Sequence, residues 1–534
     1  MPRWTAIFIH GHGGVPVTLL AALAAVLVWR TSVPRGSRTS LYVLVSVAAL
    51  GALAELVITT WYLFSPTYLD HIEASTASAA QYFRLGIALY PHLDAFTFHG
   101  LLYGPLLSEL NSLGYGLGSG VFASKLVGWA AAWVSVGLIL ALPRRRVWAW
   151  AGASAVVLYV LTAFGDVLTS DRAESLLLLF AAAGLLCVVR FAGLWTLAVA
   201  ALLAGAAGAL KLHGPIYLAP ALYWWAHAQW VREQSHSVGT WAKAASVATL
   251  AGLAGLVLPF LPPNVDVAGY LTYLTLAARH GLSVQEFIWN CAFLAGLWAP
   301  VALVWLAVRR VPGQLVVFAG VLFSLEIVVC VIGAKPGAGL HHLIPFMGYH
   351  SLLLQEMLQA GSHEPLGEAR AIRGAVVALA TVLLGTAWVA TFMFDYLLNF
   401  DLQMPAQELT RHELTQFAQR YPRGMLGVSD EESYALTNFR PWLTLTGTPQ
   451  VDYGALMDWK LSGVTDDPLV SALAACEIPY VFMPKEGAPF SLDSHYGGRL
   501  FSEAVRFEFQ RRYALLEVGT VFDVYGCGKE GSRG

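Results

Sequence analysis

The sequence predicts a polytopic α-helical membrane protein with about 12 transmembrane helices and a small C-terminal α/β domain. Two observations predict this class. Of the 534 residues, 57% are hydrophobic and 12% are charged, roughly half the charge of an ordinary soluble domain. Apolar stretches long enough to cross a bilayer recur as far as residue 394, and the chain is more polar beyond it. We therefore expect a transmembrane domain over residues 1–400 and a soluble α/β domain over residues 401–534.

Each predicted span is an apolar run near the roughly 20 residues that a membrane helix needs. In chain order the runs are Val15–Trp29, Leu41–Phe64, Val121–Leu142, Val147–Phe164, Glu174–Val189, Gly193–Leu210, His213–Ala228, Ala244–Leu261, Cys291–Val308, Gln314–Ile332, His342–Leu358 and Gly374–Phe394. The first, fifth and seventh runs are short. Two of the runs contain a carboxyl group, at Glu55 and Glu326, and an ionisable group in a span faces a cavity or a partner.

Basic residues indicate the orientation of these spans, because Lys and Arg are enriched in cytoplasmic loops. They cluster on every second loop, at Arg30 with Arg35 and Arg38, Arg144–Arg146, Arg190, Arg232 with Lys243, Arg309 with Arg310, and Arg370 with Arg373. If these six loops are cytoplasmic, the intervening loops and the tail are extracytoplasmic. We expect a multi-pass protein of the inner (plasma) membrane, with a retained N-terminal segment because no cleavage site follows Arg3.

The tail combines helix-like stretches (Pro405–Gln419, Pro468–Cys476) with strand-like ones (Met425–Val428, Tyr480–Met483, Ala514–Val518, Val521–Tyr525), which predicts an α/β domain. Cys476 and Cys527 lie in it, and either a disulfide or two buried thiols would fit. Four tail aromatics, at Tyr434, Trp442, Tyr453 and Trp459, would suit either carbohydrate binding or a core. The net charge of −2 says nothing about nucleic acid. Because no basic run suggests such a partner, we expect none.

The long first extracytoplasmic loop, residues 65–120, carries two carboxyl groups near its start. Asp70 and Glu73 are three residues apart, so on a helix they share a face. Such a pair can perform acid/base chemistry or, with His71, bind a metal. It can equally stabilise a helix start, where negative charge is favourable. The stretch Glu73–Leu89 is rich in Ala and Ser and predicts a helix along the membrane surface.

The other extracytoplasmic loops supply further carboxyl groups and an unusual set of cations. Asp166 and Asp171 lie in the second of these loops. Cations recur in three places, and these are Lys211 with His213, Arg279, and Lys335 with His341 and His342. Positive residues in extracytoplasmic loops are unexpected, because Lys and Arg are enriched in cytoplasmic loops. A shared anionic ligand such as a phosphate would explain them, and so would snorkelling of single side chains to headgroups.

In order and sidedness these motifs resemble the GT-C superfamily of membrane glycosyltransferases, which includes protein O-mannosyltransferases and a bacterial aminoarabinose transferase acting on lipid A. The resemblance covers residues 41–394. It rests on the Asp70/Glu73 motif, on the turns Tyr90-Pro91 and Tyr103-Gly104-Pro105, and on Ser170-Asp-Arg-Ala-Glu before a Leu-rich span. It also rests on the turn that ends at Pro215 and on the loop from Lys335 to Pro345.

The resemblance implies a sugar transfer from a polyprenyl-phosphate donor to an acceptor hydroxyl of a glycan, lipid or protein, with inversion. It implies Asp70 as general base with Glu73 second, and Asp171 as a further catalytic residue. Asp166, Arg84 and Tyr103 would contact the acceptor or sugar. The donor phosphate would be bound by Lys211, His213, Arg279, Lys335, His341 and His342. Members of the superfamily differ in their need for a divalent metal, Mg or Mn, and Asp70, His71 and Glu73 leave that need open.

Two other functions also fit a polytopic chain. A membrane transporter or lipid flippase would have internal repeats and a polar site near the bilayer midplane, and Glu55 and Glu326 are the residues that support it. An O-antigen-type ligase would depend on a large late extracytoplasmic loop rich in Arg and His, whereas the late loops here are short.

Overall fold

The computed structural model describes residues 38–66, 68, 70–100, 103–118, 120–142, 150, 154, 156–157, 161, 167–232, 237–308, 311–361, 406–445, 447–448 and 450–528. The predicted spans Val15–Trp29 and Gly374–Phe394, and most of Val147–Phe164, lie outside these residues. The chain forms two compact units. Unit 1 comprises Met1–Tyr62, Gly128–Leu258 and Gly281–Asn399, and unit 2 comprises Leu63–Val127, Pro259–His280 and Phe400–Gly534.

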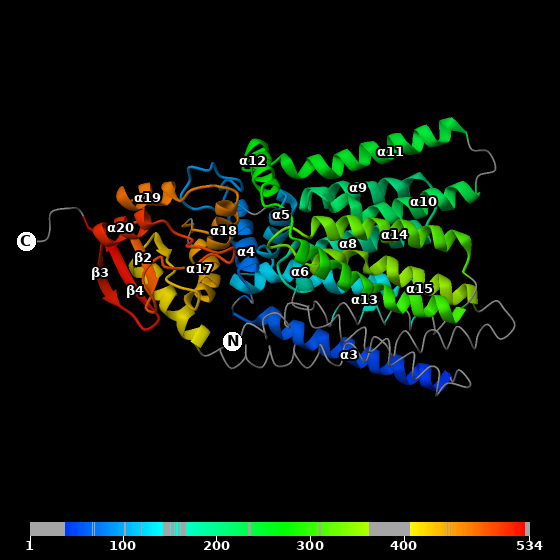
Figure 1. Cartoon of the computed structure of the whole chain (residues 1–534), viewed down its shortest axis with the longest axis horizontal. Helices are drawn as coiled ribbons and strands as arrows, with labels where there is room; N and C mark the ends of the chain where they lie inside the picture. Colours follow the sequence, from blue (N-terminus) through cyan, green and yellow to red (C-terminus); the bar gives the residue numbers. More distant parts are fainter. Residues whose placement is uncertain are drawn as a thin grey trace, which may run out of the picture. The chain divides into compact units, whose positions relative to one another are not determined.

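Unit 1 is built from long apolar helices that lie side by side (Figure 1). The helices that run through it are α3 (Arg38–Phe64), α6 (Gly120–Leu140), α8 (Ala173–Arg190), α9 (Leu194–Leu210), α10 (Ala219–Arg232), α11 (Val238–Val257), α13 (Val284–Val308), α14 (Gly313–Ile332) and α15 (Met347–Gly361). Short 3-10 helices η2 (Gly214–Leu218), η3 (Leu258–Phe260) and η4 (Leu340–Phe346) precede or follow them. Each predicted span within the described residues coincides with one of these elements.

Five helices among the described residues are long and apolar enough to cross a membrane. They are Gly120–Leu140, Ala173–Arg190, Val238–Phe260, Val284–Leu306 and Gly313–Ile332. The chain is therefore a polytopic helical protein, and the total of about 12 spans stays a prediction.

Small residues let the helices of unit 1 approach closely. Helix α9 packs on α8 and on α11. A Cβ atom on Gly205 of α9 would lie 1.9 Å from the carbonyl oxygen of Gly252, and one on Gly255 of α11 would lie 2.1 Å from that of Leu202. Contacts of this kind between backbones need glycine and are a common basis of helix association in membranes.

Glu326 is held inside unit 1 by two hydrogen bonds. The indole nitrogen of Trp298 donates to Glu326 Oε2 over 2.6 Å, and His350 Nε2 lies 2.5 Å from Oε1. These residues belong to α13, α14 and α15, so the carboxyl group joins three helices. The pairing gives Glu326 a structural role, which removes part of the support for a transporter.

Unit 2 combines a four-stranded sheet and helices of the C-terminal tail with shorter helices from two loops. The helices are α4 (His71–Arg84), α5 (Pro105–Gly114), α12 (Val267–Ala278), a helix over residues 406–420, η5 (Ser433–Phe439), α17 (Arg440–Thr444), α18 (Tyr453–Leu461), α19 (Asp467–Ala474) and α20 (Glu503–Arg512). Four strands form one sheet, and they are β1 (Gly424–Leu426), β2 (Tyr480–Pro484), β3 (Tyr513–Val518) and β4 (Phe522–Cys527).

The strand order is β1-β2-β4-β3, with β1 parallel to β2 and the other pairs antiparallel. All four predicted strand stretches and both predicted tail helices are confirmed. The sequence reasoning missed α18 and α20. Helix α18 is short and mostly buried, and α20 has only two buried residues, so neither shows a long apolar stripe.

We expected α4 to lie along the membrane surface because of its polar composition, but the structure encloses it within unit 2. Every residue from Glu73 to Tyr82 is buried, and α4 packs against α5, α17, α18 and η5 within unit 2. Its Ala and Ser side chains are small enough for neighbours to enclose the helix on all sides. Its polar groups bond to those neighbours, since Arg440 Nη2 donates to Ser75 Oγ over 2.9 Å.

Cys476 and Cys527 form a disulfide that joins the end of α19 to the end of β4, with a Cα–Cα distance of 5.8 Å. This settles the alternative that the sequence left open. Cys187, Cys291 and Cys330 are free.

We expect the disulfide to contribute about 4 kcal/mol to the stability of unit 2, because it closes a long loop in the unfolded chain. Its ends are 51 residues apart. The Cys476→Ser/Cys527→Ser variant should unfold at lower denaturant concentration than a Cys187→Ser/Cys291→Ser control. Alkylation of the unfolded, unreduced protein should label the 3 free cysteines. Labelling of all 5 cysteines without reduction would contradict the pairing.

Candidate functional site

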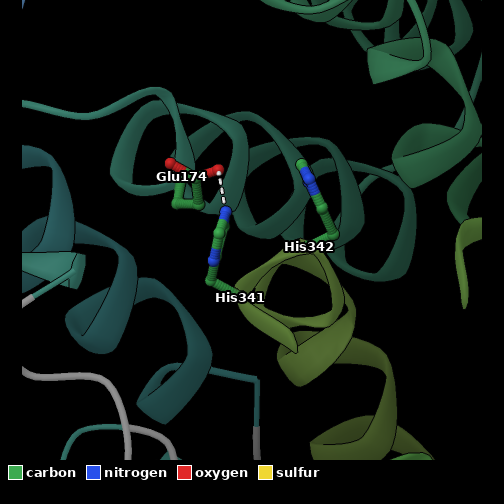
Figure 2. A group of neighbouring side chains, drawn as sticks. All are labelled: Glu174, His341 and His342. Atoms are coloured by element: carbon green, nitrogen blue, oxygen red, sulfur yellow. Dashed lines mark ion pairs between the residues drawn. The ribbon is translucent and has the colours of Figure 1, made fainter. Parts of the chain in front are cut away.

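A buried carboxylate lies beside one lysine and several histidines in unit 1. Glu174 lies in the first turn of α8, where the helix dipole favours a negative charge. Lys211 follows the last residue of α9, and its Nζ donates to Glu174 Oε1. His341, in η4, places Nε2 3.6 Å from the same oxygen (Figure 2). We call Glu174, Lys211, His213, His341 and His342 the cation cluster.

The histidines of the cation cluster contact one another through their rings. The centroids of His341 and His342 are 4.7 Å apart, and those of His213 and His342 are 5.2 Å apart. Tyr217, in η2, fixes this arrangement because its hydroxyl donates to the carbonyl oxygen of His342 over 2.9 Å. His213 Nε2 lies 3.2 Å from the same hydroxyl. Four of the six predicted phosphate ligands therefore converge.

The cation cluster is electrostatically suited to an anion. Glu174 balances the charge of Lys211, and both side chains are buried. Arg172 lies close enough to act electrostatically on Glu174, and Lys335 on His342. Arg172 and Lys335 thus add to the positive charge of Lys211 near these side chains. A phosphate placed here would receive charge-assisted hydrogen bonds, which are stronger than neutral ones.

The same residues include a group that could hold a metal ion. Ligand atoms of Glu174, His341 and His342 lie within 4.8 Å of one another. Glu174 Oε2 and His342 Nδ1 have no hydrogen-bond partner among the described residues, so two donor atoms are free for a ligand. Carboxylate and imidazole together fit a transition-metal ion such as Zn²⁺. Lys211 beside Glu174 Oε1 opposes a second positive charge there.

Asp70 and Glu73, the predicted acidic pair, lie at the start of α4 in unit 2. Asp70 caps the helix, because its Oδ1 accepts hydrogen bonds from the backbone N–H groups of Ile72 over 2.8 Å and of Glu73 over 3.0 Å. The capping role is therefore real, and it leaves the proposed catalytic role open. Glu73 is completely buried and Asp70 is half-buried. The ring centroids of His71 and Tyr434 are 5.6 Å apart.

Three of the remaining predicted site residues, Arg84, Tyr103 and Arg279, make hydrogen bonds that involve a backbone carbonyl of unit 2. Arg84 Nη1 donates to the carbonyl oxygen of Tyr115 over 2.9 Å, and the Tyr103 carbonyl accepts from Tyr90 over 2.8 Å. Arg279 belongs to unit 2, where Nη1 lies 3.4 Å from the carbonyl oxygen of Ser462. Asp171 is completely buried in the turn before α8. Asp166 lies outside the described residues.

Glu174 is the site residue that sequence reasoning missed. The sequence motif that ends at Glu174 predicts a loop before a Leu-rich span and assigns this residue no role of its own. The signal was present, because Glu174 is the one acidic residue of an otherwise apolar helix. A carboxyl group in such a helix needs a partner, and Lys211 at the end of the next helix was one candidate.

No protein-family model matches the chain, and no curated protein matches its sequence. Solved structures do match. ArnT, an aminoarabinose transferase from Cupriavidus metallidurans, is similar in its apo state with a TM-score of 0.53 at 14% identity, over 90% of this chain and 98% of ArnT. ArnT bound to undecaprenyl phosphate gives a TM-score of 0.54 at 13% identity, over 89% and 97%.

An oligosaccharyltransferase from Archaeoglobus fulgidus, in complex with zinc and sulfate, has a TM-score of 0.31 at 10% identity, over 83% of this chain and 68% of that protein. At these identities the likeness to ArnT concerns the fold. The chain therefore shares the fold of ArnT, in agreement with the GT-C-like fold that the sequence motifs predicted.

Proposed function

We propose that this chain, which has the GT-C fold, is a membrane glycosyltransferase that moves a sugar from a polyprenyl-phosphate donor to an acceptor hydroxyl. The observation that carries the proposal is the cation cluster, where Lys211 and three histidines surround one buried carboxylate. The similar ArnT structure bound to undecaprenyl phosphate supports a lipid phosphate as the ligand. The acceptor would be a glycan, a lipid or a protein.

In the proposed reaction the acceptor oxygen attacks the anomeric carbon of the donor sugar. The bond from that carbon to the phosphate oxygen breaks, its electron pair stays on the polyprenyl phosphate, and the configuration inverts. Lys211, His213, His341 and His342, with Lys335 and Arg279, are the proposed groups that stabilise the negative charge on the leaving phosphate. Glu174 would keep Lys211 charged and in place.

The acceptor proton would pass to Asp70 as general base, with Glu73 and Asp171 as the other catalytic candidates. Asp166, Arg84 and Tyr103 are proposed to contact the acceptor or sugar. We propose that residues 1–400 form the transmembrane domain in an inner (plasma) membrane. The domain over residues 401–534 would then be extracytoplasmic, as the alternation of basic loops predicts.

The direct test uses the full chain in nanodiscs with a radiolabelled polyprenyl-phosphate sugar. We expect release of polyprenyl phosphate together with label that leaves the lipid, on an acceptor or in water. A transporter or flippase would instead move the intact lipid-linked sugar across the bilayer without cleaving it. Translocation in proteoliposomes without any cleavage would overturn the proposed function.

Metal removal tests which ligand the cation cluster holds. The positive charges of Lys211, Arg172 and Lys335 oppose a divalent cation. We therefore expect dialysis against EDTA to leave the initial rate of sugar transfer within about twofold of the rate of the untreated enzyme. An enzyme that needs a metal ion for its chemistry would lose far more of its rate. A loss that Zn²⁺, Mn²⁺ or Mg²⁺ restores would assign Glu174, His341 and His342 to a metal ion instead.

A further inference from the structure

Three aromatic rings meet beside the first residue of α4 in unit 2. His71 begins α4, Tyr434 belongs to η5, and His495 lies in the loop before α20. The ring centroids are 5.6 Å apart for His71 and Tyr434, 5.4 Å for Tyr434 and His495, and 6.4 Å for His71 and His495. His495 is exposed and the other two are half-buried, so the ring cluster reaches the surface.

Carboxylates and hydroxyls border these rings. The hydroxyl of Tyr496 donates to Asp458 Oδ1 over 2.7 Å, and both side chains are half-buried. The charges of Arg440, Asp452, Asp70 and Asp458 act on Tyr434, so three carboxylates and one guanidinium lie near its ring. The Tyr434 hydroxyl is buried and has no hydrogen-bond partner among the described residues. A buried hydroxyl without a partner is uncommon and is explained when a ligand or water supplies one.

Gly454 gives the ring cluster its close packing. A Cβ atom there would lie 2.8 Å from His71 Cδ2, 3.4 Å from the Tyr434 hydroxyl and 3.5 Å from Asp452 Oδ1. Glycine at this position therefore lets two rings and a carboxylate approach one point. The neighbouring aromatics Tyr453 and Trp459 are buried in the hydrophobic core, so they cannot contact a ligand.

We propose that His71, Tyr434, His495 and Tyr496, with Asp458, form a saccharide-binding subsite. Ring faces of this kind pack against the C–H face of a sugar, and carboxylates and tyrosine hydroxyls bond to its hydroxyls. The carboxylates repel an anionic group, so the sugar is neutral or carries an amino group. This inference rests on the proposed function in one respect, namely that the bound saccharide is part of the acceptor, next to the proposed base Asp70.

The test measures the binding of free sugars to the full chain in detergent micelles by saturation-transfer difference NMR. The probes are glucose, mannose, galactose and glucosamine at millimolar concentration. We expect saturation transfer to at least one sugar with the wild-type protein. The dissociation constant from a titration of this signal should rise about tenfold, equivalent to about 1.4 kcal/mol, in His495→Ala and in Tyr434→Ala. Gly454→Ala should weaken binding too, because the added methyl displaces His71.

His412→Ala is the matched control, since His412 is an exposed histidine of the same unit that bonds to Gln416 away from the rings. It should bind sugar like the wild type. Equal signals in His495→Ala and His412→Ala, or no signal for any probe with the wild type, would overturn the subsite. The unfolding transition of each variant, followed by tryptophan fluorescence, reports its folding, and binding of undecaprenyl phosphate is measured in parallel. If the wild type binds sugar but not undecaprenyl phosphate, the proposed function fails and the subsite stands.

Discussion

Replacing Asp70 with asparagine is expected to lower the rate of sugar transfer by about 10²–10⁴-fold, the usual contribution of a general base. The chain should remain folded, because asparagine caps a helix about as well as aspartate. Asp70 Oδ1 accepts two backbone hydrogen bonds, and the amide oxygen of asparagine can accept both. The substitution therefore removes the basic group and keeps the cap. The measurement is the initial rate of transfer at saturating donor.

Asp266→Asn provides a matched control for this experiment. Asp266 caps α12 in the same unit through hydrogen bonds from Ala268 and Gly269, and it has no predicted role in the chemistry. Its variant should keep the wild-type rate. Asp70→Ala, by contrast, should also lose about 1 kcal/mol of stability with the cap. If Asp70→Asn and Glu73→Gln both transfer sugar at the wild-type rate, the base is neither residue, and Asp171 becomes the candidate.

The second large effect is expected from the buried pair of Lys211 and Glu174. Lys211→Met or Glu174→Gln alone should destabilise the protein by about 3–5 kcal/mol, because each leaves one buried charge without its partner. The double variant should recover most of that loss, since replacing both members of a buried ion pair is often neutral. The measurement is the unfolding transition in detergent, followed by tryptophan fluorescence.

Ligand binding separates the structural role of this pair from its proposed function. The double variant should regain stability without regaining affinity for undecaprenyl phosphate, because the phosphate loses its main cation. Lys243→Met is the control, since Lys243 is exposed on α11. If the stable double variant binds undecaprenyl phosphate as tightly as the wild type, the pair is structural and the phosphate is bound elsewhere.

Local properties of the sequence predicted most of the fold. A membrane span is recognised by the length of one apolar run, and a strand by the alternation within a few residues. The predicted spans within the described residues and the four tail strands therefore agree with the structure. The loop motifs also predicted the GT-C fold, because their order along the chain is itself a property of the sequence. By the same reasoning, α4 was predicted as a helix but not as a buried one.

The candidate site depended on contacts that no local pattern contains. The sequence by itself determined that cations recur at residues 211, 213, 341 and 342 on loops of one predicted side. Only the tertiary structure decided that they converge on Glu174, because α8 packs against η2 and η4. It likewise paired Cys476 with Cys527 and buried Trp459 while leaving Tyr434 within reach of solvent. The length of an apolar run and the positions of charged residues can be read within a short stretch of sequence. A binding site, by contrast, requires residues far apart in sequence to become neighbours through packing.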